Sequence, residues 1–241
     1  MKAEIPDYPS WCDRIEDFSD WHSAEWRWIL DKLRNPSVII IRGTGRSGKT
    51  AMAYLLLELA HKMGQTCHMM GGSPGPVDYI EQIESIKDLQ NREGKKALLI
   101  DDIGAIGLTA RNHASSESKY LQQFSTIISH KEITIIISIQ NLALLDVKGL
   151  MTAQDSIVLH KLSNPFGISL ERDWAQHLLD HANDYLHYLL DTYYNLPSYD
   201  SKEHEGKGLF YDVNTSRVAY SPLPEFYTDE ISRSYKQEGI S

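Results

Sequence analysis

The segment at residues 43–50 constrains the fold of this chain more than any other part of the sequence. It is Gly-Thr-Gly-Arg-Ser-Gly-Lys-Thr, which matches the pattern G-x-x-x-x-G-K-[ST] without a mismatch. Residues 38–41 before it are typical of a buried strand, and residues 51–57 after it favour a helix. A Gly-rich turn between a strand and a helix directs backbone N–H groups and the positive helix end toward phosphate oxygens. The segment therefore predicts a phosphate-binding loop in an α/β fold.

Each part of this loop has an expected role in binding Mg-ATP. Lys49 is expected to bridge the β- and γ-phosphates, and Thr50 is expected to place its hydroxyl on Mg²⁺. A chance Gly-rich turn is the alternative, and the strand and helix on either side argue against it. The expected nucleotide-binding residues are Gly43, Thr44, Gly45, Arg46, Ser47, Gly48, Lys49 and Thr50.

Two carboxylates follow another apolar segment further along the chain. Residues 97–100 are Ala-Leu-Leu-Ile, and Asp101 and Asp102 come directly after them. Asp101 is expected to complete the Mg²⁺ shell, usually through water, because Mg²⁺ prefers oxygen ligands and keeps several waters. Asp102 is expected to face the γ-phosphate and polarise the attacking water. Alone, the pair would indicate a strand-to-turn corner. Together with the loop, it indicates a metal site.

Strands and helices alternate through the middle of the chain, which indicates βαβ units and a parallel sheet with its ligand at the carboxyl ends of the strands. An extra strand lies in sequence between the strand of the loop and the acidic strand. This is typical of the additional-strand, RecA-like α/β class of P-loop NTPases. With the strands numbered along the chain, we expect the sheet order 5-1-4-3-2. The predicted strands are residues 38–41, 65–70, 97–100, 133–139 and 155–160, and the predicted helices are residues 49–63, 77–91 and 120–129.

The two ends of the chain are expected to complete one domain around an ATPase core at residues 37–165. Residues 1–36 are a Trp-rich N-terminal extension, in which residues 20–33 are expected to form an amphipathic helix that packs on the sheet. A role in subunit contacts is the alternative for this helix. Residues 166–241 are expected to add a long helix and a hairpin at residues 209–213 and 217–220. The predicted apolar stripe of the long helix is Leu170, Trp174, Leu178, Ala182, Leu186 and Leu190.

A polar residue, Gln140, directly follows the predicted strand at residues 133–139. In this class of fold, an amide at this place can hydrogen-bond both the γ-phosphate and the attacking water. An ordinary polar residue at a strand end is the alternative. The run Ile-Ile-Ile-Ser-Ile-Gln-Asn at residues 135–141 resembles the FtsK–HerA superfamily of DNA-pumping ATPases, which carries a Gln at this position. The resemblance covers residues 36–165.

The FtsK–HerA resemblance implies a hexameric or pentameric ring that uses ATP hydrolysis to translocate double-stranded DNA. The small viral members of that superfamily are genome-packaging ATPases, so the resemblance also implies a capsid vertex protein as a partner. Many members carry Glu where this chain has Asp102, which is one methylene shorter. Members also supply an arginine finger to the neighbouring subunit, and residues 129–132, where it often lies, contain no arginine. Arg111 is the nearest candidate, with a solvated loop residue as the equal alternative, and Arg172 lies beyond.

The composition limits the other possibilities. A net charge of −9 and a pI of about 5.5 argue against a generally basic nucleic-acid-binding surface, although a ring can line a channel with few basic side chains. No apolar run approaches the roughly 20 residues of a membrane span. The absence of a secretory pattern and of paired cysteine spacing favours the cytoplasm. Two other functions stay open: a helicase-loader-type AAA+ ATPase, which residues 99–104 also resemble, and an ATP-dependent regulatory switch that translocates nothing.

Overall fold

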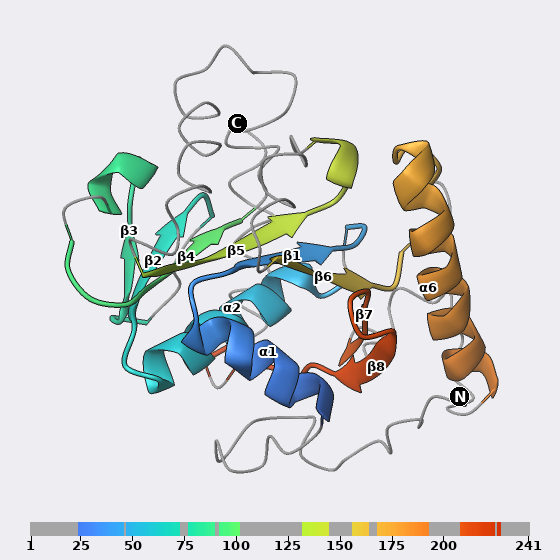
Figure 1. Cartoon of the computed structure of the whole chain (residues 1–241), viewed down its shortest axis with the longest axis horizontal. Helices are drawn as coiled ribbons and strands as arrows, with labels where there is room; N and C mark the ends of the chain where they lie inside the picture. The colour runs from blue at the N-terminus through green and yellow to red at the C-terminus, as the bar shows by residue number, and fades with distance from the viewer. Residues whose placement is uncertain are drawn as a thin grey trace.

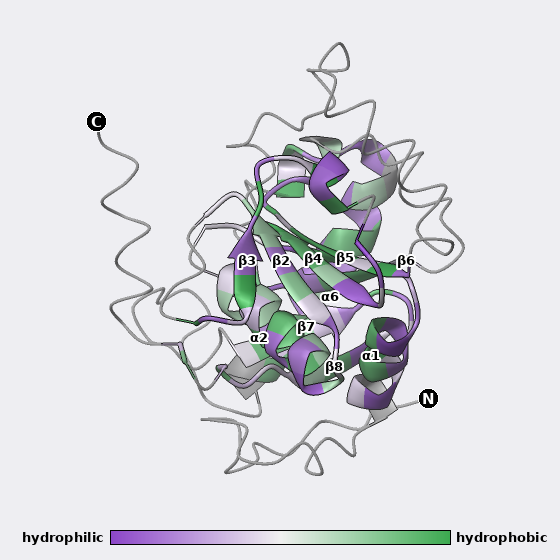
Figure 2. Cartoon of the chain, turned by 90° about the vertical axis from the view of Figure 1, so that its left-hand side faces the viewer, coloured by the Kyte–Doolittle hydropathy of each residue, from purple (hydrophilic) through white to green (hydrophobic). Residues whose placement is uncertain are grey.

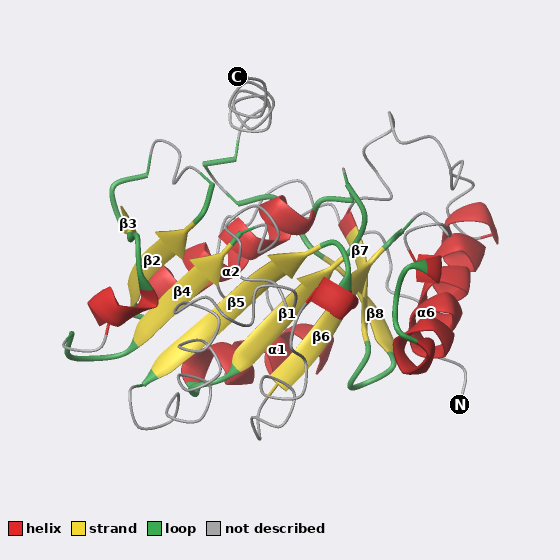
Figure 3. Cartoon of the chain, turned by 90° about the horizontal axis from the view of Figure 1, so that it is seen from above, coloured by secondary structure: helices red, strands yellow, loops and turns green. Residues whose placement is uncertain are grey.

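A mixed β-sheet forms the centre of the molecule (Figure 1). The computed structural model describes residues 24–45, 47–72, 77–89, 92–101, 132–144, 156–163, 168–192, 208–224 and 226–227. The strands within these residues are β1 (Val38–Arg42), β2 (Thr66–Met70), β3 (Ile80–Gln82), β4 (Lys96–Ile100), β5 (Ile133–Ile139), β6 (Ser156–Lys161), β7 (Leu209–Asp212) and β8 (Arg217–Tyr220). Their order across the sheet is β3-β2-β4-β5-β1-β6-β7-β8, as seen from above in Figure 3.

The five central strands confirm the predicted topology. The predicted strands correspond to β1, β2, β4, β5 and β6, and their observed order, β6-β1-β5-β4-β2, is the expected 5-1-4-3-2. All five run parallel to their neighbours within this group. Every residue of β1, β4 and β5 is buried, which explains why these strands are almost continuous apolar runs. The arrangement is the RecA-like α/β sheet expected from the sequence.

Helices pack against both faces of this sheet, and the helix on the second face stands at the end of the sheet formed by β6, β7 and β8 (Figures 1 and 3). α1 (Ala24–Arg34) and α2 (Lys49–Lys62) lie on one face, where their apolar side chains share a core with Ile39 and Ile41 of β1. α6 (Asp173–Thr192) lies on the opposite face, where its first half shares a core with Val38 and Ile40. This division follows from the alternation of side chains along a strand. Figure 2 shows hydrophobic residues running along the central strands.

The prediction of a helix at residues 77–91 is wrong. This segment forms the short edge strand β3, which pairs in parallel with β2, followed by a 3₁₀ turn, η3 (Ile86–Leu89). Its apolar residues recur every three positions, and a step of three drifts by about 60° around an α-helix. The extended chain instead packs Ile80 on the α2 face and Ile83 on the opposite face. It also provides backbone partners at the edge of β2, since Ile83 N donates to Met69 O at 2.9 Å.

The N-terminal helix packs as expected in its described part, α1. Trp26, Ile29 and Leu33 are buried in the core that α1 shares with α2 and the strands. The indole Nε1 of Trp26 donates to Tyr220 O at 2.7 Å, and its ring meets Phe210 edge-on. One tryptophan therefore connects α1 to both β7 and β8.

The prediction of which apolar residues form the buried face of the long C-terminal helix is wrong in part. Ala182 and Leu186 are buried as expected, but Leu170 and Leu178 are exposed by 55% and 41%. The side chains of Trp174 and Leu190 lie outside the described residues. A constant step of four drifts by about 40° per step around an α-helix, so the predicted stripe winds around it. The buried face follows alternating steps of four and three, at Ala175, Leu179, Ala182, Leu186 and Leu189.

The predicted C-terminal hairpin is confirmed. β7 and β8 pair antiparallel, and β7 continues the sheet beyond β6. The carboxylate of Asp212 accepts hydrogen bonds from Asn214 N at 2.9 Å and from Thr215 Oγ1 at 2.8 Å, which stabilises the turn between the two strands. The helix predicted at residues 120–129 lies outside the described residues.

None of the helices that the structure describes combines the length and the apolar character needed to cross a membrane.

Candidate functional site

The Gly-rich loop lies between β1 and α2, at the carboxyl edge of the parallel strands. Its first residue extends the pairing of β1 with β5, because Gly43 N donates to Ile139 O at 3.2 Å. Gly48 has a φ of 83°, in the left-handed region that favours glycine, and α2 begins at the next residue. The loop therefore ends directly on a helix N-terminus, the geometry that a phosphate requires.

Gly43 has no room for a side chain. A Cβ built on it would lie 2.4 Å from Ser47 Oγ, 2.8 Å from Lys161 Cβ and 3.3 Å from Lys49 Cγ. The first contact involves a residue of the same loop, and the second involves the last residue of β6. Glycine at this position thus allows the loop to turn back while β6 packs beside it.

The side chain of Lys49 folds back over the loop. Its Nζ donates a hydrogen bond to Thr44 O at 2.8 Å, and the residue is largely buried. An ammonium group has three donor hydrogens, so further acceptors can bind to it. The predicted phosphate-binding lysine is therefore held at the loop by a backbone oxygen of the loop itself.

The two predicted magnesium ligands lie together. Thr50 Oγ1 donates to Asp101 Oδ1 at 3.4 Å, across the gap between α2 and the end of β4. Asp101 is buried, and its backbone N donates to Met70 O at 3.1 Å, which fixes it to β2. A hydroxyl and a carboxylate are oxygen donors of the kind that Mg²⁺ prefers, so these residues fit that ion.

Gln140 lies at the same edge of the sheet. It directly follows β5, whose last residue, Ile139, is level with Arg42 at the end of β1. Its side chain is exposed, so the amide is available to a ligand. The structure thus brings Lys49, Thr50, Asp101 and Gln140 to one edge. Three other predicted residues, Arg46, Asp102 and Arg111, lie outside the described residues.

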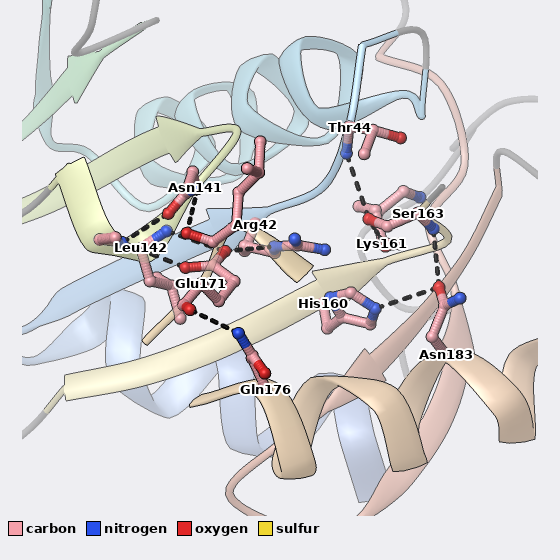
Figure 4. Close-up of polar contacts among 12 residues, drawn as sticks. Arg42, Thr44, Asn141, Leu142, His160, Lys161, Ser163, Glu171, Gln176 and Asn183 are labelled. Atoms are coloured by element: carbon pink, nitrogen blue, oxygen red, sulfur yellow. Dashed lines mark hydrogen bonds and ion pairs between the residues drawn. The ribbon is translucent and has the colours of Figure 1, made fainter. Parts of the chain in front are cut away.

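Lys161 and Ser163, at the end of β6, also belong to this edge, and neither was predicted from the sequence. Ser163 Oγ accepts a hydrogen bond from Thr44 N at 3.1 Å and donates one to Lys161 O at 2.9 Å (Figure 4). Lys161 is fully buried, and burial together with the charge of Lys49 lowers its pKa to about 7. The signal available in the sequence was the same as for Gln140, namely polar residues at the end of a buried strand.

An asparagine on α6 reaches the same group of residues. Asn183 Oδ1 accepts a hydrogen bond from Ser163 N at 2.8 Å and lies 3.4 Å from His160 Nε2 (Figure 4). His160 is buried, and burial followed by the charge of Arg42 lowers its pKa to about 3. The contacts from Thr44 through Ser163 to Asn183 connect the loop with the helix on the far face of the sheet.

Residues 22–173 of the chain match the model of a protein family described as Novel STAND NTPase 3. No curated protein matches the sequence.

Two of the solved structures that share the fold are a packaging ATPase and a conjugation coupling protein. The chain is similar to B204, the DNA-packaging ATPase from Sulfolobus Turreted Icosahedral Virus, with a TM-score of 0.51 and 14% identity over 79% of this chain and 99% of that chain. It is also similar to the pCW3 conjugation coupling protein TcpA, with a TM-score of 0.50 and 13% identity over 86% of this chain and 66% of that chain. At these identities the similarity concerns the fold alone, and it confirms the P-loop α/β class predicted from the sequence.

Proposed function

This chain belongs to the Novel STAND NTPase 3 family, and from that premise we propose that it binds and hydrolyses Mg-ATP at the loop of residues 43–50. The observation that carries the proposal is the contact of Thr50 with Asp101 beside this loop, because it joins a phosphate site to a metal site. Lys49 lies at the same place, with its ammonium on Thr44 O.

Each polar residue of the site has a proposed role. The ammonium of Lys49 would contact the β- and γ-phosphates of ATP over the N-terminus of α2. Thr50 and Asp101 would hold Mg²⁺, which neutralises charge on the phosphate oxygens when it is bound. Asp102, next in the chain, would accept a proton from the attacking water. The amide of Gln140 would orient that water and contact the γ-phosphate.

We further propose that the subunits form a ring that translocates double-stranded DNA, in the manner of a viral genome-packaging motor. Support comes from the FtsK–HerA resemblance of residues 135–141 and from the shared fold with a viral DNA-packaging ATPase. In such a ring Arg111 would act as the arginine finger on the nucleotide of the next subunit, and a capsid vertex protein would be the docking partner. An arginine finger is worth about 10³ to 10⁵ in rate, so hydrolysis should depend on assembly.

The test is the ATPase rate per subunit, measured over a range of protein concentrations, with and without linear double-stranded DNA. We expect the rate to rise with concentration, because the site is completed by a neighbouring subunit, and to rise further with DNA. A rate that is flat in protein concentration and insensitive to DNA would contradict the translocase while leaving the ATPase in place.

A variant of Lys49 distinguishes ATP hydrolysis at this site from hydrolysis by a contaminating ATPase. Lys49→Ala should abolish the activity, whereas the matched variant Lys87→Ala, at an exposed position in η3, should retain it. Full activity of Lys49→Ala would overturn the assignment of the site.

A regulatory switch that binds ATP and translocates nothing is the second candidate function. The net charge of −9 favours it, because that charge argues against a generally basic surface for DNA, and the description of the matched family names an NTPase without reference to DNA. Slow turnover unaffected by DNA would support the switch. A helicase-loader-type AAA+ ATPase normally carries a small helical lid, and the hairpin of β7 and β8 after α6 argues against that class.

We also propose one domain with an N-terminal extension at residues 1–36, an ATPase core at residues 37–165 and a completing part at residues 166–241. Supporting this, β7 joins the sheet of the core through β6. The protein would act in the cytoplasm, and for a viral chain in the host cytoplasm or in association with the virion.

A further inference from the structure

The carboxylate of Glu171 lies in a buried polar cluster near the start of α6 (Figure 4). Its Oε1 accepts hydrogen bonds from Arg42 Nε and from the backbone N of Leu142, each at 3.0 Å. Its Oε2 accepts one from the backbone N of Ala143 at 3.1 Å. The side chains of Arg42 and Glu171 are fully buried, so these bonds form where the effective dielectric is low and polar contacts are strong.

These contacts join three segments that are far apart in the sequence. Arg42 ends β1 and directly precedes Gly43, the first residue of the phosphate-binding loop. The backbone N–H groups belong to η5 (Leu142–Leu144), the 3₁₀ turn after β5. Glu171 itself lies between the sheet and α6. One carboxylate, in the segment that leads into α6, thus contacts both the last residue of β1 and the turn after β5.

Gln140 lies between two residues, Ile139 and Asn141, that each form a hydrogen bond to another part of the chain. On one side, the carbonyl of Ile139 accepts a hydrogen bond from Gly43 N at 3.2 Å. On the other side, Asn141 Nδ2 donates to Leu170 O at 3.1 Å. The first contact ties Gln140 to the phosphate-binding loop, and the second ties it to the segment that carries Glu171. The position of the amide therefore depends on both.

The segment that carries Glu171 is anchored to α6. Gln176 Nε2 donates to the backbone O of Glu171 at 2.7 Å and to Ser169 O at 3.1 Å. Ala175 and Leu179, on the adjoining turns of α6, are buried in the core on this face. Movement of the turn after β5 therefore requires movement at the start of α6.

We propose that Glu171 is a positioning residue, whose carboxylate holds the turn after β5 against Arg42 and so sets where the Gln140 amide lies relative to the phosphate-binding loop. This inference rests on the proposed function, because it takes Gln140 as the group that contacts the γ-phosphate.

A carboxylate is required because three donors converge on two oxygens. In Glu171→Gln, an NH₂ group replaces one of these oxygens, and it then either faces a backbone N–H or turns toward Arg42. Arg42 also loses its counter-charge. We expect the turn after β5 to shift, and Gln140 to shift with it.

The test is the preference of the full chain for a non-hydrolysable ATP analogue over ADP, measured by calorimetry. Wild type should prefer the analogue, and Gln140→Ala should reduce that preference. Glu171→Gln should reduce it by a similar factor, about tenfold, as expected for the loss of one hydrogen bond to a charged group. The double variant should lose no more than either single variant, because both remove the same contact.

Two further variants control for stability. Glu58→Gln makes the same change in another buried carboxylate, which pairs with Lys62 Nζ at 2.8 Å within α2, and it should keep the preference. If Glu171→Gln does not fold, Arg42→Met/Glu171→Leu removes both charges together, so neither is left buried without its partner, although the N–H groups of Leu142 and Ala143 lose their acceptor. The folded double replacement should show the same loss of preference.

Two results would overturn this inference and leave the proposed function in place. The first is an undiminished preference for the ATP analogue in folded Glu171→Gln or folded Arg42→Met/Glu171→Leu. The second is a loss of preference in Gln140→Ala/Glu171→Gln that equals the product of the losses in the two single variants. Wild type that binds no nucleotide would instead overturn the proposed function, and this inference with it.

Discussion

A single methyl group at Gly43 would collide with the side chains of Ser47 and Lys161. Gly45, two residues further along the same loop, has no neighbouring atom within 4 Å of a Cβ built on it. The two glycines belong to the same sequence pattern, yet only one is demanded by packing against β6. The difference between them gives a matched pair of variants.

We predict that Gly43→Ala weakens nucleotide binding and lowers stability by about 1–3 kcal/mol, the usual cost of overpacking a tight site. The clash pushes the loop away from β6 and changes where its N–H groups point. Gly45→Ala should change the stability little, because a Cβ at Gly45 meets no atom of the described residues within 4 Å. Calorimetric titration with ATP and thermal unfolding measure the two effects, and equal behaviour of both variants would contradict the explanation.

At the scale of elements, α6 reaches across to the phosphate-binding loop through Asn183. Its Oδ1 accepts a hydrogen bond from Ser163 N, and Ser163 Oγ accepts one from Thr44 N. The helix therefore contributes to the shape of a loop on the opposite side of β6, in addition to covering the sheet.

We predict that Asn183→Leu lowers stability by about 1–3 kcal/mol, because it leaves the buried N–H of Ser163 without its acceptor. The KM for ATP should rise as well, since Thr44 is held through Ser163. Asp184→Ala, at the next and exposed position of α6, is the control and should have little effect on either quantity. Denaturant unfolding and steady-state kinetics provide the measurements. A destabilised variant with an unchanged KM would limit Asn183 to a role in folding.

At the scale of the whole molecule, the sheet buries ionisable groups as well as apolar ones. Burial, with the charge of Arg42, lowers the pKa of His160 to about 3, below its ordinary value of 6.5. Between these two values the unfolded chain binds a proton at this residue and the folded chain does not. Stability therefore falls as the pH decreases from about 6.5 toward 3, by at most about 1.4 kcal/mol per pH unit from this residue.

We predict that His160→Gln makes acid unfolding less steep over this window, because glutamine keeps an amide near Asn183 and does not titrate. Urea unfolding at a series of pH values gives the slope for each protein. Identical slopes for the wild type and the variant would contradict the assigned cause.

The sequence predicted the parts of the fold that depend on local chemistry and on the chain order of apolar segments. The loop at residues 43–50, the order of the five parallel strands and the C-terminal hairpin belong to this group. The helix predicted at residues 77–91 failed because a step of three suits both a poor helix and an extended edge segment. The choice depends on β2, whose edge would lack backbone partners if residues 80–82 did not pair with it as β3.

The candidate site divides in the same way. Lys49, Thr50 and Asp101 were identifiable because phosphate and Mg²⁺ demand those residue types at that spacing, and the structure places all three at one edge. Lys161, Ser163 and Glu171 follow no such pattern. Their importance arises from contacts with residues far away in the chain, across β6 and the start of α6.

The sequence by itself therefore determined the class of fold and the loop on which the site is built, because both follow from local residue types and their order. Only the tertiary structure decided which face of α6 is buried and which polar residues join Arg42 and Thr44 at the loop. The physical reason is that burial and hydrogen bonding depend on which segments pack together, and sequence spacing does not specify that packing.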